Sequence, residues 1–264
     1  MKFAFMTLAC PDWELATVPV RAAEYGFDGV ELRVWGDRHV DPAMTSEQRA
    51  ACRALFAQHG VAICGLASYA TFNGLTTEKL EENAKKLRDA IDLAADLGAP
   101  VVRAFVGDKP EELPWKQAFA QAARYLDDGM DYAGLRGVTV AVETHDDYCK
   151  LPVLQELFGG MRHAPSLVWD MQNTFNVGQP GAPLIETFGM AAIKHVHIRD
   201  AKTGGQLVLT GEGDMPLHAN LDLLVANGYT GYVSLEWEKT WQPQLEEPEA
   251  ALPHFIAYVG SYRG

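Results

Sequence analysis

Short runs of apolar and β-branched residues alternate with longer amphipathic segments along the whole chain. Eight runs have the length and composition of strands, and they begin at Lys2, Gly29, Val61, Pro100, Val138, Ser166, Lys194 and Tyr232. Between them we expect helices, among others over 46–58, 77–97, 115–132 and 217–226, several of them followed by glycine. Eight strand–helix units in 264 residues predict one (β/α)8 TIM barrel, a single α/β domain over residues 1–264.

A doubly wound open sheet is the alternative, because it also alternates strands with helices. Such a sheet normally has fewer strands and a glycine-rich phosphate-binding loop. No such loop follows any expected strand, and Gly211-Glu212-Gly213 has the pattern of a tight turn. No serine- and glycine-rich linker divides the chain, so the sequence favours the barrel.

Composition and charge exclude several classes of partner. The chain has 48% hydrophobic and 22% charged residues, as is typical of a globular protein, and its net charge of −13 argues against binding to nucleic acid or to an anionic membrane. The apolar opening stops at Pro11 without a cleavage site, and no run is long enough to span a bilayer. Four scattered cysteines, without C-x-x-C spacing, predict reduced thiols in a cytoplasmic protein.

Many polar side chains are expected inside the barrel, where branched apolar residues are usual. Strand parity directs the following residues inward: Glu31, Arg33, Arg103, Glu143, His145, Asp170, His195, His197, Glu236 and Glu238. Buried carboxylates are costly unless a cation compensates them. Three of them and a histidine converge at the carboxyl ends of the strands, which predicts a divalent-metal site. The oxygen-rich set suits Mn²⁺ or Mg²⁺, and the imidazole also allows Co²⁺ or Zn²⁺.

Six phrases carry a resemblance to a known family. In chain order they are GFDGVELR, AVETHDDY, WDMQNT, HVHIRD, TGEGD and GYTGYVSLEWEK. Together they resemble the xylose isomerase-like TIM-barrel superfamily of sugar phosphate isomerases and epimerases. In that family a Glu ending strand five, an Asp ending strand six, a His on strand seven and a Glu on strand eight hold the metal. The resemblance places these ligands on Glu143, Asp170, His197 and Glu236.

The resemblance implies a metal-dependent sugar isomerase or epimerase. One divalent ion, with Mn²⁺ first among the candidates, would chelate a carbonyl oxygen and the adjacent hydroxyl of a small sugar or polyol. Glu143 and Glu236 would be the catalytic residues, one removing a proton and the other returning it through a metal-stabilised enediolate. Dimers and tetramers are common among similar proteins, so a homo-oligomer is a further expectation.

Four residues beside the ligands are candidates for substrate binding, each with an alternative role. His145 and Asn173 would contact substrate hydroxyls or act behind the ligands, and similar ketose 3-epimerases have a histidine where this chain has Asn173. Arg199 suits a carboxylate or phosphate, although a salt bridge with Asp200 is an equal possibility. Lys239 would be a base or substrate clamp, or else a solvated loop residue.

Other inward residues have structural interpretations. We expect His195 to be a hydrogen-bonded core residue, and Glu31 and Arg103 to form a buried ion pair. Asp170 could instead cap a helix, and Glu143 and Glu236 could pair with an inward arginine. Three tryptophans after strands one, two and eight would wall the pocket or pack between loops: Trp13, Trp35 and Trp241.

Three other functions compete with the isomerase. A lyase would use the same enolate to eliminate water, as in the inosose and 3-dehydroshikimate dehydratases that the chain also resembles. A DNA-repair endonuclease of this superfamily would need more histidines and a less acidic protein. A non-catalytic sugar-binding protein would bind the metal without catalysing proton exchange.

Overall fold

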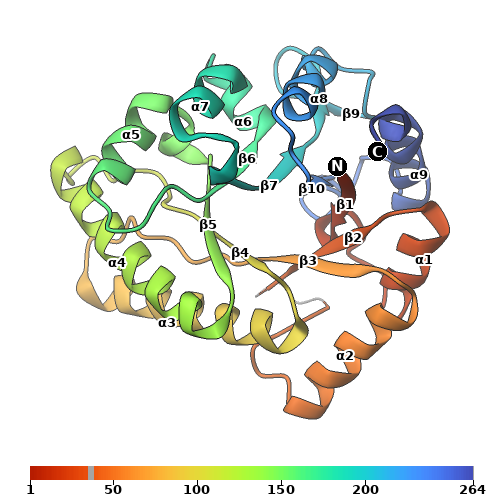
Figure 1. The fold of residues 1–264 in the computed structure, drawn as a ribbon, viewed down its shortest axis with the longest axis horizontal. Coiled ribbons are helices and arrows are strands. Elements are labelled where there is room, and N and C mark those ends of the chain that lie inside the picture. Colours follow the sequence, from red (N-terminus) through yellow and green to blue (C-terminus); the bar gives the residue numbers. More distant parts are fainter. Residues whose placement is uncertain (35–38, 264) are drawn as a thin grey trace.

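Eight parallel strands form a closed barrel in the computed structural model, which describes residues 1–34 and 39–263. The sheet order is β1-β10-β7-β6-β5-β4-β3-β2, and pairing of β1 with β10 closes it (Figure 1). The barrel strands are β1 Lys2–Met6, β2 Gly29–Arg33, β3 Ala62–Ala67, β4 Val101–Ala104, β5 Thr139–Glu143, β6 Leu167–Asp170, β7 Ile193–Ile198 and β10 Tyr232–Leu235. The predicted TIM barrel is confirmed, and the open sheet is excluded.

Helices surround the barrel and follow its strands in the chain (Figure 1). Their bounds are α1 Thr17–Tyr25, α2 Ser46–Gln58, α3 Thr77–Leu97, α4 Trp115–Arg136, α5 Leu151–Gly159, α6 Met171–Asn176, α7 Gly181–Phe188, α8 Leu217–Ala226 and α9 Pro248–Val259. Four short 3-10 helices are η1 Thr7–Ala9, η2 Asp146–Cys149, η3 Met190–Ala192 and η4 Gly260–Tyr262. The predicted bounds of α2, α3 and α8 are confirmed, whereas α4 continues beyond 132.

Local sequence signals explain where these helices begin and end. The hydroxyl of Thr45 accepts a hydrogen bond from the backbone of Gln48, whose side chain accepts one from the backbone of Thr45, which makes a capping box before α2. Gly98 and Gly137 follow α3 and α4 with φ of 77° and 69°. These left-handed conformations favour glycine, so the chain turns from each helix directly into the next strand.

A small hairpin after β7 was not predicted. Its strands, β8 Asp200–Ala201 and β9 Leu207–Val208, pair antiparallel. The Asp200 carboxylate accepts backbone N–H groups of Gly211 and Gly213 at 2.8 and 2.9 Å. The predicted turn at 211–213 is therefore held by this buried carboxylate. Because Asp200 is engaged in this way, the salt bridge considered between it and Arg199 is wrong.

The remaining expectations concern the thiols and the membrane. All four cysteines are free and buried. Burial raises the pKa of Cys52 to about 11, and burial with nearby carboxylates raises that of Cys149 to about 12. Within the described residues, no helix combines the length and apolarity required to cross a bilayer.

Candidate metal centre

Four strand ends bring the predicted ligands together. Glu143 and Asp170 are the last residues of β5 and β6, His197 lies near the end of β7, and Glu236 directly follows β10. Each offers one donor atom, and these atoms all lie within 4.8 Å of one another. All four residues are buried. The register of the parallel strands explains this convergence. Asp170 of β6 lies beside His197 of β7, and the backbone N–H of Glu236 donates a hydrogen bond to the carbonyl of Ile198 in β7.

Two arginines compensate part of the negative charge. Nη1 of Arg103 lies 3.2 Å from Oε2 of Glu143 and 3.6 Å from Oε1 of Glu236. Nη1 of Arg199 lies 3.0 Å from Oδ2 of Asp170 and also contacts Oε2 of Glu236. The alternative pairing of Glu143 and Glu236 with an inward arginine therefore exists alongside the four-residue cluster.

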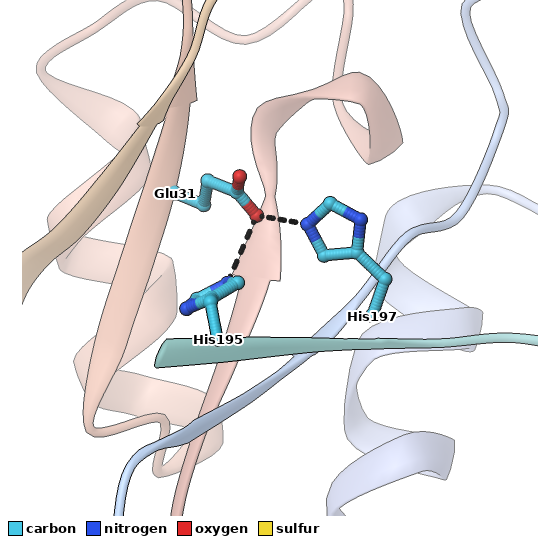
Figure 2. A group of neighbouring side chains, drawn as sticks. All are labelled: Glu31, His195 and His197. Carbon is cyan, nitrogen blue, oxygen red and sulfur yellow. Dashed lines mark hydrogen bonds and ion pairs between the residues drawn. The ribbon is translucent and has the colours of Figure 1, made fainter. Parts of the chain in front are cut away.

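The expected ion pair between Glu31 and Arg103 is wrong. Oε2 of Glu31 lies 3.2 Å from Nε2 of His195 and 2.9 Å from Nε2 of His197 (Figure 2). Arg103 is directed to Glu143 and Glu236 instead. The prediction of His195 as a hydrogen-bonded core residue is confirmed, because it is buried and bonded to Glu31.

Charge and burial compete at the two most enclosed groups. Burial would raise the pKa of Glu143, but Arg103 and His197 lower it to about 2. Burial would lower the pKa of His197, but Glu31 and Glu143 raise it to about 10. At neutral pH in the metal-free protein, Glu143 is therefore a carboxylate and His197 is an imidazolium.

The donor set fits a divalent cation. Among the described residues, no hydrogen-bond donor satisfies Oε2 of Glu143, Oδ2 of Asp170 or Oε2 of Glu236, although arginines make ion-pair contacts with them. Unsatisfied buried oxygens are costly, and a cation among them would offset this cost. Nδ1 of His197 lies 2.7 Å from Oε1 of Glu143 and adds one nitrogen donor. Three carboxylates and one imidazole suit Mn²⁺, Co²⁺ or Zn²⁺.

Asp170 caps a helix, which was the alternative considered for it, and it is also a member of the four-residue cluster. Its Oδ1 accepts a hydrogen bond from the backbone N–H of Asn173 at 2.7 Å, which caps α6. Its Oδ2 accepts none among the described residues and contacts Arg199. The cap fixes the orientation of the carboxylate and leaves one oxygen for the cluster.

Asn173 and Arg199 lie beside the cluster. Oδ1 of Asn173 accepts a hydrogen bond from Nη2 of Arg199 at 2.9 Å, and Gln172 accepts one from Nε of Arg199. Nδ2 of Asn173 is buried without a hydrogen-bond partner among the described residues. Asn173 thus keeps a free amide donor for a ligand, whereas the arginine is held in place by its neighbours.

His145 and Lys239 are engaged elsewhere. Nδ1 of His145 lies 2.8 Å from a carboxylate oxygen of Asp146, and its ring packs on Phe105. Nζ of Lys239 donates to the carbonyls of Pro243 and Leu245 and to Glu247, all at 2.6–2.8 Å. Substrate binding by either residue remains a prediction, and the lysine is buried rather than solvated.

Aromatic side chains lie around the inward arginines. The Tyr69 ring centre is 5.7 Å from the guanidinium of Arg33 and 5.4 Å from that of Arg103, and Trp241 lies 4.9 Å from Arg33. Tyr69 was not predicted, although its position just after β3 is a signal for this rim. The ring of Trp13 packs on that of Phe5 in β1. Trp35 lies outside the described residues.

The fold matches known proteins. A family model described as xylose isomerase-like TIM barrel matches residues 19–258. Similar solved structures include the IOLI protein with a bound zinc atom (18% identity, TM-score 0.82, 100% of both chains covered) and the probable 3-DHS dehydratase AsbF from Bacillus anthracis (15%, 0.79, 100% of both). An L-ribulose 3-epimerase is also similar (17% identity, TM-score 0.80, 99% of this chain and 94% of that one). No curated protein matches the chain in sequence.

Proposed function

The chain belongs to the xylose isomerase-like TIM barrel family, and we propose that it is a divalent-metal-dependent isomerase or epimerase of a small sugar or related polyol. One observation carries this proposal: four donor residues converge within 4.8 Å, and three of their buried oxygens accept no hydrogen bond from the described residues. Two similar structures support the proposal, because one holds a zinc atom and the other is an L-ribulose 3-epimerase.

Glu143, Asp170, His197 and Glu236 would hold the ion, with Mn²⁺ as the first candidate. The bound ion would polarise a substrate carbonyl and thereby acidify the adjacent C–H. The remaining chemistry is proton transfer by side chains of this chain.

Glu143 and Glu236 are the proposed acid and base. Both lie near Nη1 of Arg103, and whichever of the two acts as the carboxylate accepts the proton from carbon. The electron pair of the broken C–H bond moves into an enediolate of the substrate. The other glutamate, which has to enter this step as the protonated carboxylic acid, gives its proton to carbon and becomes a carboxylate. Substrate handedness decides which of the two acts first.

Asn173 and Arg199 are the proposed substrate contacts nearest the glutamates. The unpartnered Nδ2 of Asn173 is suited to donate to a substrate hydroxyl. Arg199 is fixed by Gln172 and Asn173, so its charge has a defined position beside Glu236. His145 and Lys239 would act farther out, after their present partners release them.

The test compares the wild-type chain with Glu236→Gln and with the control Glu238→Gln. Glu238 lies outside the four-residue cluster, and its side chain is 24% exposed. Elemental analysis after incubation with Mn²⁺ should find about one ion per chain in the wild type and the control, and none in Glu236→Gln. Deuterium from D₂O should then enter a ketose carbon only with the wild type and Glu238→Gln.

Several results would change this conclusion. If neither the wild type nor the variants bind metal, the mechanism fails. Metal binding without deuterium exchange in any ketose or aldose would leave a sugar-binding protein. A product lighter than its substrate by one water would establish the dehydratase that is the alternative to the isomerase.

A further inference from the structure

A second contact of His197 lies on the side of the ring away from the three carboxylates. Its Nδ1 faces Glu143 at 2.7 Å and Glu236 at 3.9 Å, whereas its Nε2 faces Glu31 at 2.9 Å. Figure 2 shows that Glu31 reaches both histidines of β7 with a single carboxylate oxygen. The contact crosses the barrel, because β1 and β10 lie between β2 and β7 in the sheet.

Hydrogen-bond chemistry decides which nitrogen of His197 keeps its proton. A neutral imidazole carries one N–H, and an ionised carboxylate can only accept. Oε2 of Glu31 faces Nε2 of both His197 and His195, so this oxygen is placed to accept a hydrogen bond from each ring. Nδ1 faces Glu143 at 2.7 Å, so a metal bound among the four ligands would displace the Nδ1 proton, and the proton that His197 keeps would lie on Nε2 against Glu31.

A second metal ion among Glu31, His195 and His197 is the competing explanation, because their donor atoms also lie within 4.8 Å of one another. The 2.9 Å between Nε2 of His197 and Oε2 of Glu31 is the length of a direct charge-assisted hydrogen bond. A second ion would also require His197 to lose both of its protons. The hydrogen bond is therefore the better explanation.

We propose that Glu31 is a positioning residue that holds the His197 proton on Nε2 and so directs the Nδ1 lone pair to the metal. This inference rests on the metal centre proposed above, but not on the reaction or its substrate. Histidine ligands of metals commonly donate their other N–H to a carboxylate, and loss of that partner typically weakens metal binding ten- to a hundredfold. His195 donates to the same oxygen and would fix the Glu31 carboxylate in place.

The test measures metal binding and the histidine tautomer in the absence of any sugar. The wild-type chain, Glu31→Gln and Glu31→Ala are stripped of metal and titrated with Co²⁺ against a chromophoric chelator. Both variants should bind about one Co²⁺ per chain with ten- to a hundredfold lower affinity, and Glu31→Gln should lose less, because its amide oxygen still accepts the Nε2 proton. Nitrogen NMR of the Zn²⁺-loaded wild type should show His197 protonated at Nε2 and bound to the ion through Nδ1.

Three outcomes would overturn the inference. One is an unchanged Co²⁺ affinity in a folded Glu31→Gln protein, with folding checked by circular dichroism. Another is a His197 proton on Nδ1 in the Zn²⁺-loaded protein. The third is two Zn²⁺ ions per wild-type chain with one lost in Glu31→Gln, which would establish a second metal site. Normal metal results without any turnover would instead refute only the isomerase proposal.

Discussion

Arg103 and Glu143 form an ion pair inside the barrel, with Nη1 of the arginine 3.2 Å from Oε2 of the carboxylate. Their strands, β4 and β5, are neighbours in the sheet, and both side chains are almost completely buried. The arginine therefore supplies positive charge next to the position where the proposed ion would add more. This arrangement predicts that the arginine matters most to stability when no metal is bound.

Replacement of Arg103 by methionine should destabilise the metal-free protein by about 3 kcal/mol, because it leaves Oε2 of the buried Glu143 carboxylate without its cationic partner. Saturating Mn²⁺ should reduce this loss, since the ion would compensate Glu143 instead. Urea denaturation with and without Mn²⁺ measures both values. Arg136→Met is the control: Arg136 pairs with Asp92 on the surface, and its loss should cost less than about 1 kcal/mol. An equal loss with and without Mn²⁺ would contradict the prediction.

Metal affinity should rise with pH. In the metal-free protein the pKa of His197 is about 10, so at neutral pH a metal must displace the Nδ1 proton. Deprotonation becomes easier as pH rises, and Co²⁺ affinity should therefore increase about tenfold per pH unit from about pH 7 to about pH 9. Calorimetry in buffers of different ionisation enthalpy should detect about one proton released per ion near pH 7. An affinity that levels off just above neutrality would indicate an ordinary histidine.

Strand periodicity predicted the faces of the site residues but not their partners. The alternation of side chains along each strand correctly placed Glu31 and Arg103 inside the barrel. It does not say how high along the barrel axis each side chain lies. The β2–β3 ladder shifts register between Val30 and Glu31, so that Cys64 is passed over. Such a shift has no signature in the hydrophobic pattern, and it changes which side chains meet across the barrel. Glu31 meets the two histidines of β7 across the barrel, and Arg103 meets Glu143 and Glu236, so the expected ion pair does not form.

The four-residue cluster was predictable because each member lies at, near or directly after the end of a strand. Glu143, Asp170, His197 and Glu236 occupy equivalent places in four strand–helix units, and parallel strands bring equivalent places together. Lys239 lies in an irregular segment instead, and Asp200 begins the short hairpin strand β8. Their partners, the loop around Pro243 and the turn at 211–213, follow no periodicity, so those contacts required the structure.

Gly213→Ala should destabilise the protein by about 1–3 kcal/mol through overpacking. A Cβ there would lie 2.0 Å from Oδ1 of Asp200 and 2.7 Å from the Ala201 carbonyl, and neither has room to move. Gly134→Ala is the matched control: it lies within α4, where a Cβ meets nothing within 4 Å. That change should be neutral or stabilise by about 0.5–1 kcal/mol. Thermal unfolding of both variants checks the contrast, and equal midpoints would refute it.

The thiols should be unreactive in the folded protein. All four are buried, and the raised pKa values of Cys52 and Cys149 keep the unreactive protonated form. Ellman's reagent should label less than about one thiol per native chain within minutes, and all four after denaturation in guanidinium chloride. Rapid labelling of the native chain would show that a cysteine is accessible.

Closure of the barrel sets the order in which the site is assembled. Three proposed ligands come from β5, β6 and β7, but the fourth follows β10, the strand whose pairing with β1 completes the ring. A chain emerging from the ribosome therefore carries an incomplete set of donors until nearly all of it has been synthesised. Tight capture of the ion then has to wait for the last strand to dock, and metal loading becomes a marker of finished folding.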